Sequence, residues 1–179
     1  MRGPTAPPAR CRTANGRERT AAQWGLSSLA AIVLAVTPSW ASAQRVRVSN
    51  LADVDFGLIS DPQAEARRSQ SLCLYNNGGN GTYSVSASGS GAGSAFVLNS
   101  GAHSLPYRVE WSDKSGQSSG VALAPAVPLT GQTSSARNQS CSTGPATSAS
   151  LAIVLQATEL SQAREGSYNG TLTLLIAAE

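Results

Sequence analysis

The sequence predicts an all-β fold, a sandwich of short strands, for most of the chain. Beyond its first 43 residues the chain is rich in Ser, Gly, Ala and Thr, and its apolar residues alternate with polar ones instead of recurring at helical spacing. Turn-forming stretches separate these runs, such as NNGGNG at 76–81 and SDKSGQSSG at 112–120. Several short strands joined by such turns are typical of a β-sandwich.

The expected strands follow one another at short intervals. The clearest is YRVEW at 107–111, whose first, third and fifth residues are apolar, which gives the strand one core face and one wet face. Only 62–68 and 157–164 have the composition of a helical turn or two, and no long helix is expected. The predicted strands are Val46–Val48, Val54–Phe56, Ser71–Tyr75, Tyr83–Ser86, Phe96–Leu98, Tyr107–Trp111, Leu151–Leu155 and Thr171–Ile176.

Residues 1–43 have the composition of an export signal. Five arginines precede an apolar stretch around Leu26–Val36, and Ala41-Ser42-Ala43 has the small residues of a cleavage site. The apolar stretch is shorter than the roughly 20 residues that a membrane span requires, which favours a cleaved signal over a membrane anchor. We therefore expect a signal peptide at 1–43 and one exported domain at 44–179, with no membrane span after cleavage.

Removal of the signal changes the charge of the protein. The whole chain has a formal net charge of +3, but residues 44–179 hold eight basic and nine acidic residues, a net charge of −1. Their basic residues form no cluster beyond the pair Arg67-Arg68. The sequence therefore gives no indication of a nucleic-acid partner.

The cysteines that remain after signal cleavage are Cys73 and Cys141. An even pair in an exported chain predicts a disulfide, and two free buried thiols are the alternative. Closing a loop of this length would stabilise the fold by roughly 4 kcal/mol in the chain-entropy model.

The one formal catalytic motif is GQSSG at Gly116–Gly120, which matches a nucleophile elbow with Ser118 as nucleophile. That elbow requires a buried strand before the serine and a helix after it, whereas a polar loop precedes Ser118 and a stretch with two prolines follows it. His103 is the only histidine, and its neighbours GAHSLPY are typical of a surface turn. We therefore expect no enzymatic activity; a hydrolase built on Ser118 and His103 is the remote alternative.

No metal site or cofactor is expected. With one histidine and two cysteines that are expected to pair, a zinc site would depend on the carboxylates of Asp53, Asp55 and Asp61, which show no ligand spacing.

Four aromatic residues are expected in the core because they alternate with polar neighbours or precede a strand. The alternative is that they are exposed and stack on sugars, as in a carbohydrate-binding module. These residues are Tyr83, Tyr107, Trp111 and Tyr168.

Several separated segments resemble the spore coat protein U (SCPU) domain family, which includes subunits of archaic chaperone-usher pili. The similar segments are VDFG at Val54–Gly57, a cysteine-containing stretch at Ser71–Gly91, LPYRVEWSD at Leu105–Asp113 and GSYNGTLTLLI at Gly166–Ile176. Their order and spacing carry the resemblance, which covers nearly all of residues 44–179.

The resemblance implies an immunoglobulin-like sandwich that is incomplete because it lacks its last strand. The strand Thr171–Ile176 would then border an open groove, lined by Leu172, Leu174 and Ile176, that another polypeptide fills by donor-strand complementation. A periplasmic chaperone would lend the strand first, an outer-membrane usher would assemble the fibre, and a neighbouring pilus subunit would supply the final strand. The protein would pass through the periplasm and end at the cell surface as a pilus subunit that supports attachment or biofilm formation.

Two departures from the family pattern keep other functions open. The first strand lacks the cysteine that many members have there, and Cys141 takes its place. Only about ten residues separate Gln44 from the VDFG segment, which leaves little room for an N-terminal donor strand. A tip-proximal adhesin or a free secreted surface-binding module is therefore the alternative to a fibre subunit.

Overall fold

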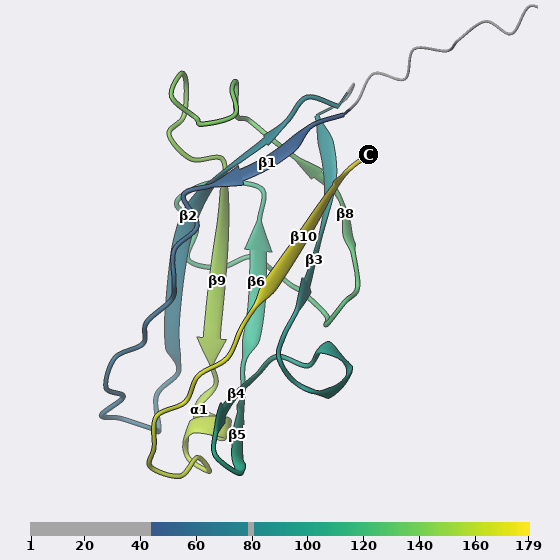
Figure 1. Cartoon of the computed structure of the whole chain (residues 1–179). Helices are drawn as coiled ribbons and strands as arrows, with labels where there is room; N and C mark the ends of the chain where they lie inside the picture. The colour runs from purple at the N-terminus through teal and green to yellow at the C-terminus, as the bar shows by residue number, and fades with distance from the viewer. Residues whose placement is uncertain (1–43, 79–80) are drawn as a thin grey trace, which may run out of the picture. The chain divides into compact units, whose positions relative to one another are not determined.

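The structure is a computed structural model and describes residues 44–78 and 81–179. The signal peptide predicted at residues 1–43 lies outside the described residues. Figure 1 shows short strands joined by loops. The described residues also form a short 3₁₀ turn, η1 (Ala92–Ser94), and a short helix, α1 (Ala157–Leu160). The strands are β1 (Val46–Ser49), β2 (Ala66–Asn76), β3 (Thr82–Ser88), β4 (Val97–Ser100), β5 (His103–Pro106), β6 (Arg108–Ser112), β7 (Val121–Ala122), β8 (Leu129–Thr133), β9 (Ala149–Leu155) and β10 (Thr173–Ala178).

The strands form two sheets that face each other. One has the strand order β1-β2-β9-β6-β7, the other has the order β10-β3-β8, and β4 and β5 form a separate hairpin. Every ladder between these strands is antiparallel. In Figure 1, β10 crosses in front of β6, and β3 and β8 lie to the right of β6. The predicted fold class, an all-β immunoglobulin-like sandwich, is confirmed.

Alternation along the strands builds the core between the two sheets. Tyr83 and Trp111 are fully buried and come from opposite sheets, with ring centroids 6.3 Å apart and nearly perpendicular planes. The Trp111 Nε1–H donates a hydrogen bond of 3.2 Å to the Tyr83 hydroxyl. Tyr107 is also buried and stacks on Phe96 with centroids 5.7 Å apart. Three of the aromatic residues predicted in the core, Tyr83, Tyr107 and Trp111, therefore lie there. Burial raises the pKa of Tyr83 to about 12.

The predicted disulfide between Cys73 and Cys141 is present in the structure. Cys73 is fully buried in β2, and Cys141 lies in the loop between β8 and β9. The Ser134 and Ser148 hydroxyls of the same loop both donate to the carbonyl of Leu74, and the Leu74 N–H donates back to Ser148. The disulfide therefore acts together with hydrogen bonds that hold this loop against β2.

Some predicted elements differ from the structure. Val54–Phe56 joins no ladder and lies in the coil that connects β1 to β2, where side chains of β2 bond its backbone. The helical turn considered at 62–68 is a turn followed by the start of β2, and the one at 157–164 is helical only at 157–160. The last strand begins at Thr173, two residues later than predicted. The predictions missed β5, β7 and β8, whose side chains are mostly exposed and so lack a clear apolar alternation.

Candidate functional site

The two strands β1 and β10 each end a sheet and leave one backbone edge unpaired. β10 pairs only with β3, in a register that sets Leu174 opposite Ala87 and Ile176 opposite Val85. β1 pairs only with β2, and it lies in contact with β10. Among the described residues, no strand bridges these two edges. An unpaired edge is a template for strand addition.

Side chains on the inner face of β10 are less buried than those on the strand beside it. On β3, Tyr83, Val85 and Ala87 all have 0% exposure. On β10, Leu174 and Ile176 pack against the same core but remain half-buried. Leu172, just before β10, is also half-buried against the core. The structure therefore brings together the three predicted groove residues, Leu172, Leu174 and Ile176, beside the unpaired edge of β10.

Residues 50–61, which we call the strap, contribute further apolar side chains to the same core. The strap connects β1 to β2 and in Figure 1 runs as a coil beside β2. Phe56 and Ile59 are half-buried and pack against the core, and Val54 is also half-buried. In contrast, Leu58 is 95% exposed and Leu51 is 48% exposed. Sequence analysis treated 54–56 as an ordinary strand and missed its position. The apolar alternation of Val54 and Phe56 suits a paired strand and a coil held beside a strand equally, so the sequence carried no signal for this position.

The fourth predicted core aromatic residue, Tyr168, lies at the margin of the core. It is half-buried against the core cluster, and its hydroxyl donates to the carbonyl of Arg164 at 3.0 Å. Asn169 next to it forms an isolated antiparallel bridge with Asn99 of β4. Tyr168 and Asn169 therefore fix the path of the chain into β10.

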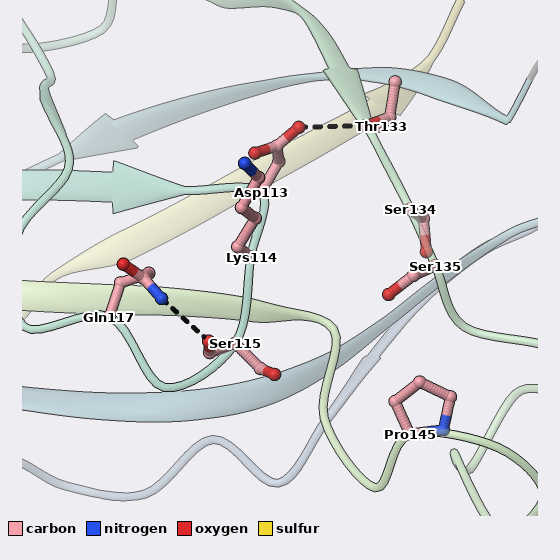
Figure 2. A pocket seen from close by; sticks show the side chains of 8 residues that line it. All are labelled: Asp113, Lys114, Ser115, Gln117, Thr133, Ser134, Ser135 and Pro145. Atoms are coloured by element: carbon pink, nitrogen blue, oxygen red, sulfur yellow. Dashed lines mark hydrogen bonds between the residues drawn. The ribbon is translucent and has the colours of Figure 1, made fainter.

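A second candidate site is a polar hollow of about 490 Å³ next to the end of β6 (Figure 2). The Thr133 hydroxyl donates to Asp113 at 2.9 Å, and the Gln117 amide donates to the Ser115 carbonyl at 3.2 Å. Figure 2 shows these side chains around the hollow, with Lys114 and Pro145. The lining residues are Asp113, Lys114, Ser115, Gln117, Thr133, Ser134, Ser135 and Pro145.

The backbone of the loop at 112–120 is held by two serines of the sheet beneath it. The Ser71 hydroxyl of β2 accepts from the Gly116 N–H at 2.8 Å. The Ser150 hydroxyl of β9 accepts from the Gln117 N–H at 3.0 Å and donates to the Lys114 carbonyl at 2.8 Å. These bonds fix the loop that presents the polar side chains of the hollow.

The same loop covers an ion pair on the outer face of the larger sheet. Arg67 of β2 donates to Glu110 of β6 with a shortest N–O distance of 2.6 Å. Glu110 also accepts from the Gly120 N–H, and Arg67 donates to the Ser118 carbonyl. The hydrogen bond from Arg67 holds the pKa of Glu110 below its ordinary value. Sequence analysis placed Glu110 on the wet face of its strand, and this was wrong because the loop folds back over it.

The residues of the formal hydrolase motif do not form a catalytic pair. Ser118 is exposed, and its backbone carbonyl is engaged with Arg67. His103 is exposed in β5, part of the hairpin with β4, and no hydrogen bond joins it to Ser118. Residues 44–78 and 81–179 contain no cluster of His, Cys, Asp and Glu side chains that could hold a metal ion. In the same residues, no helix has the length and hydropathy of a membrane span.

Comparisons with known proteins leave the family of the chain open. No protein-family model matches the sequence, and no curated protein matches it. The resemblance to the spore coat U family therefore stays a prediction. Among solved structures, a chain from a chaperone–tip adhesin complex in CFA/I fimbriae biogenesis is similar, with a TM-score of 0.48 and 12% sequence identity. The match covers 76% of this chain and 41% of that chain, so this protein spans less than half the length of the chain it matches.

Proposed function

We propose that this protein is an exported, non-enzymatic pilus subunit that accepts a strand from another polypeptide between β10 and the strap. The observation that carries the proposal is the contrast between β3 and β10. Their inner faces belong to one sheet, yet the residues of β3 are fully buried while Leu174 and Ile176 of β10 are half-buried. A strand laid along the unpaired edge of β10 would supply the missing cover.

The expected gain from such a strand is large for a small domain. Complete burial of a Leu or Ile side chain is worth about 1.5–3 kcal/mol, of which roughly half is still available at a half-buried position. The incoming strand would also bury its own apolar side chains and pair with the free N–H and C=O groups of β10. Together these terms are comparable with the roughly 5–15 kcal/mol that stabilises a typical domain.

The proposed partners follow from the similarity to the spore coat U family. A periplasmic chaperone would fill the site first, an outer-membrane usher would direct assembly, and a neighbouring subunit would replace the chaperone strand in the fibre. The protein would then lie at the cell surface and support attachment. This order of partners requires export of the protein, and therefore the export signal predicted at residues 1–43.

Co-expression with the cognate periplasmic chaperone tests the proposal. The precursor is produced in the periplasm with an affinity-tagged chaperone, and the complex is isolated through the tag. We expect the wild-type protein to be recovered in complex with the chaperone and to be less stable and more prone to aggregate when it is purified alone. Recovery of a stable, soluble monomer that ignores the chaperone would refute the proposal.

The polar hollow favours a second candidate, a surface-binding module or tip-proximal adhesin. Its loop is held in place by Ser71 and Ser150, so Asp113, Lys114 and Gln117 are already ordered for polar contacts. A ligand rich in hydroxyl groups, such as a glycan, fits this chemistry. Screening the purified protein on a glycan array tests the candidate, and Asp113→Ala with Gln117→Ala should abolish any binding at the hollow. Binding that survives both substitutions would exclude the hollow.

A further inference from the structure

Two polar side chains of β2 occupy positions that the fold normally gives to core residues. Alternation along β2 puts Arg68 and Gln70 on the same face as Leu72 and Leu74, which are fully buried in the core. Gln70 is instead half-buried, and Arg68 is exposed. The polarity of these two positions requires an explanation, because an inward-facing position on a sandwich strand is usually apolar.

Both side chains contact the backbone of the strap. The Gln70 amide accepts from the Ala52 N–H at 2.9 Å and donates to the Ala52 carbonyl at 3.0 Å. Arg68 donates to the carbonyls of Asp55 at 3.3 Å and Phe56 at 3.4 Å. Its guanidinium carbon also lies 5.8 Å from the centroid of the Phe56 ring. Two neighbouring inward positions of β2 therefore hold the strap at three successive points.

These contacts replace a backbone ladder. Among the described residues, no backbone N–H or C=O of residues 50–60 takes part in a backbone–backbone hydrogen bond. Gln70 imitates the paired N–H and C=O of a neighbouring strand at Ala52, but it does so with its side chain. Most peptide groups of the strap are therefore left without a backbone partner while the segment is held beside β2.

We propose that Arg68 and Gln70 are positioning residues that hold the strap as the second wall of the strand-accepting site. This inference rests on the proposed function, since it assigns these residues a part in strand capture. Side-chain clamping holds Phe56 and Ile59 against the core and leaves the strap peptide groups that neither Arg68 nor Gln70 contacts available to an incoming strand that also pairs with β10.

The test uses a double variant in which apolar side chains of similar length replace the clamp, Arg68→Met with Gln70→Leu. If Arg68 and Gln70 only filled space, the double variant would leave the strap in place, because apolar residues suit an inward position and the core is unchanged. If the two residues hold the strap through hydrogen bonds, the double variant should release the strap and leave the rest of the fold intact. Ser69→Ala is the matched control, because Ser69 lies between the two residues, is exposed and faces the opposite way.

Two readouts are measured on the protein secreted to the periplasm. The first is the rate of limited chymotrypsin cleavage after Phe56 or Leu58, with the fragments identified by mass after reduction. The second is recovery with the tagged chaperone. We expect cleavage in the strap to be at least tenfold faster in the double variant, and recovery with the chaperone to fall at least tenfold. The urea midpoint reported by Trp111 fluorescence should stay unchanged, and Ser69→Ala should behave as wild type.

Graded variants strengthen the test. Gln70→Glu keeps an acceptor for the Ala52 N–H but loses the donor to the Ala52 carbonyl, so its cleavage rate should lie between those of wild type and the double variant.

An unchanged strap cleavage rate in the double variant would overturn the inference, as would faster cleavage with undiminished recovery. If the wild-type protein itself is not recovered with the chaperone, the proposed function fails and the role in strand capture fails with it. The cleavage rates then decide separately whether the clamp exists.

Discussion

Leu174 and Ala87 face each other across the β10–β3 ladder, yet Ala87 is fully buried and Leu174 is only half-buried. Partners in one ladder share a face of the sheet, so the same core lies beneath both residues. The difference in burial therefore comes from the side of β10 that has no neighbouring strand. Leu174 is therefore a core residue that is incompletely buried and that lies on the strand with the unpaired backbone edge.

Leu174→Asp should damage both folding and partner capture, because it puts a carboxylate against apolar core residues. We expect the free energy of unfolding to fall by about 2 kcal/mol or more. The matched control is Leu175→Asp, the same substitution one residue later, where the side chain points to the other face and is 68% exposed. That variant should change stability by less than about 0.5 kcal/mol.

Urea unfolding of the two variants and recovery with the tagged chaperone measure this difference. Wild type and Leu175→Asp should be recovered as complexes, and Leu174→Asp should not. Equal recovery of both variants would mean that the inner face of β10 is not the surface covered by the partner.

The hydrogen bond between Trp111 and Tyr83 should contribute to stability because both groups are fully buried. Tyr83→Phe removes the acceptor and leaves the indole N–H without a partner, which should cost about 1–2 kcal/mol. Tyr107→Phe is the control, since no hydrogen bond of the Tyr107 hydroxyl would be lost. Trp111 is the only tryptophan in residues 44–179, so its fluorescence reports unfolding in both variants. A similar loss in both would argue against a special role for this bond.

Alternation predicted the parts of the fold that have one buried face. β3 buries every second residue, and Val109 and Trp111 of β6 follow the same alternation in the sequence. Nearly every residue of β9 is buried, so alternation does not describe that strand. The same logic failed for β7 and β8, which lie at sheet edges and have few buried side chains. Their pairing depends on which strand lies beside them, and local sequence does not encode that relationship strongly.

The sequence predicted only those residues of the candidate site that lie together in one segment of the chain. Leu172, Leu174 and Ile176 follow from alternation in a single segment, whereas the strap depends on contacts between residues far apart in the chain. Gln70 and Ala52 are 18 residues apart, and neither one by itself indicates the other. Arg68 and Gln70 are polar at positions of β2 where an apolar residue is expected, and the sequence shows this. Their role becomes clear only from the structure, in which the strap lies beside them.

Ser118→Ala and His103→Ala should leave fibre assembly or surface attachment intact, because neither side chain has a partner that could activate a nucleophile. Cells that produce each variant at normal protein level are compared with wild type in an attachment assay. Loss of attachment in both variants would revive a catalytic or ligand-binding role for these residues.

The disulfide should account for a substantial part of the stability of the domain. Its cysteines are separated by 68 positions, and the chain-entropy model assigns roughly 4 kcal/mol to closing such a loop. Urea unfolding with and without a reductant should show a loss of about 2–4 kcal/mol. Mass measurement after alkylation under non-reducing conditions provides the control. Two alkylatable thiols in native periplasmic material would contradict the assignment.

The Arg67–Glu110 ion pair should make stability depend on pH on the acidic side. The pKa of Glu110 in the folded protein lies below its ordinary value of 4.5 because Arg67 hydrogen-bonds the charged carboxylate. A carboxyl group whose folded pKa is lowered adds stability that is fully present above its unfolded pKa and is lost as pH falls through the folded pKa. The contribution of Glu110 should therefore be complete at neutral pH and should be lost progressively as the pH falls below 4.5 toward the lower pKa of the folded protein.

Glu110→Gln removes the charge and keeps the shape of the side chain, so it isolates this contribution. At pH 7 the variant should be less stable than wild type by about 1–2 kcal/mol, since Arg67 keeps only a neutral acceptor at this position. Urea midpoints measured from pH 7 to pH 3 should converge as the wild-type carboxylate is protonated. Glu65→Gln is the control, because Glu65 also pairs with Arg67, at 3.2 Å, but its side chain is 47% exposed. That variant should lie close to wild type at every pH. Wild-type and Glu110→Gln curves that stay parallel across this range would show that the ion pair does not set the acid sensitivity of the domain.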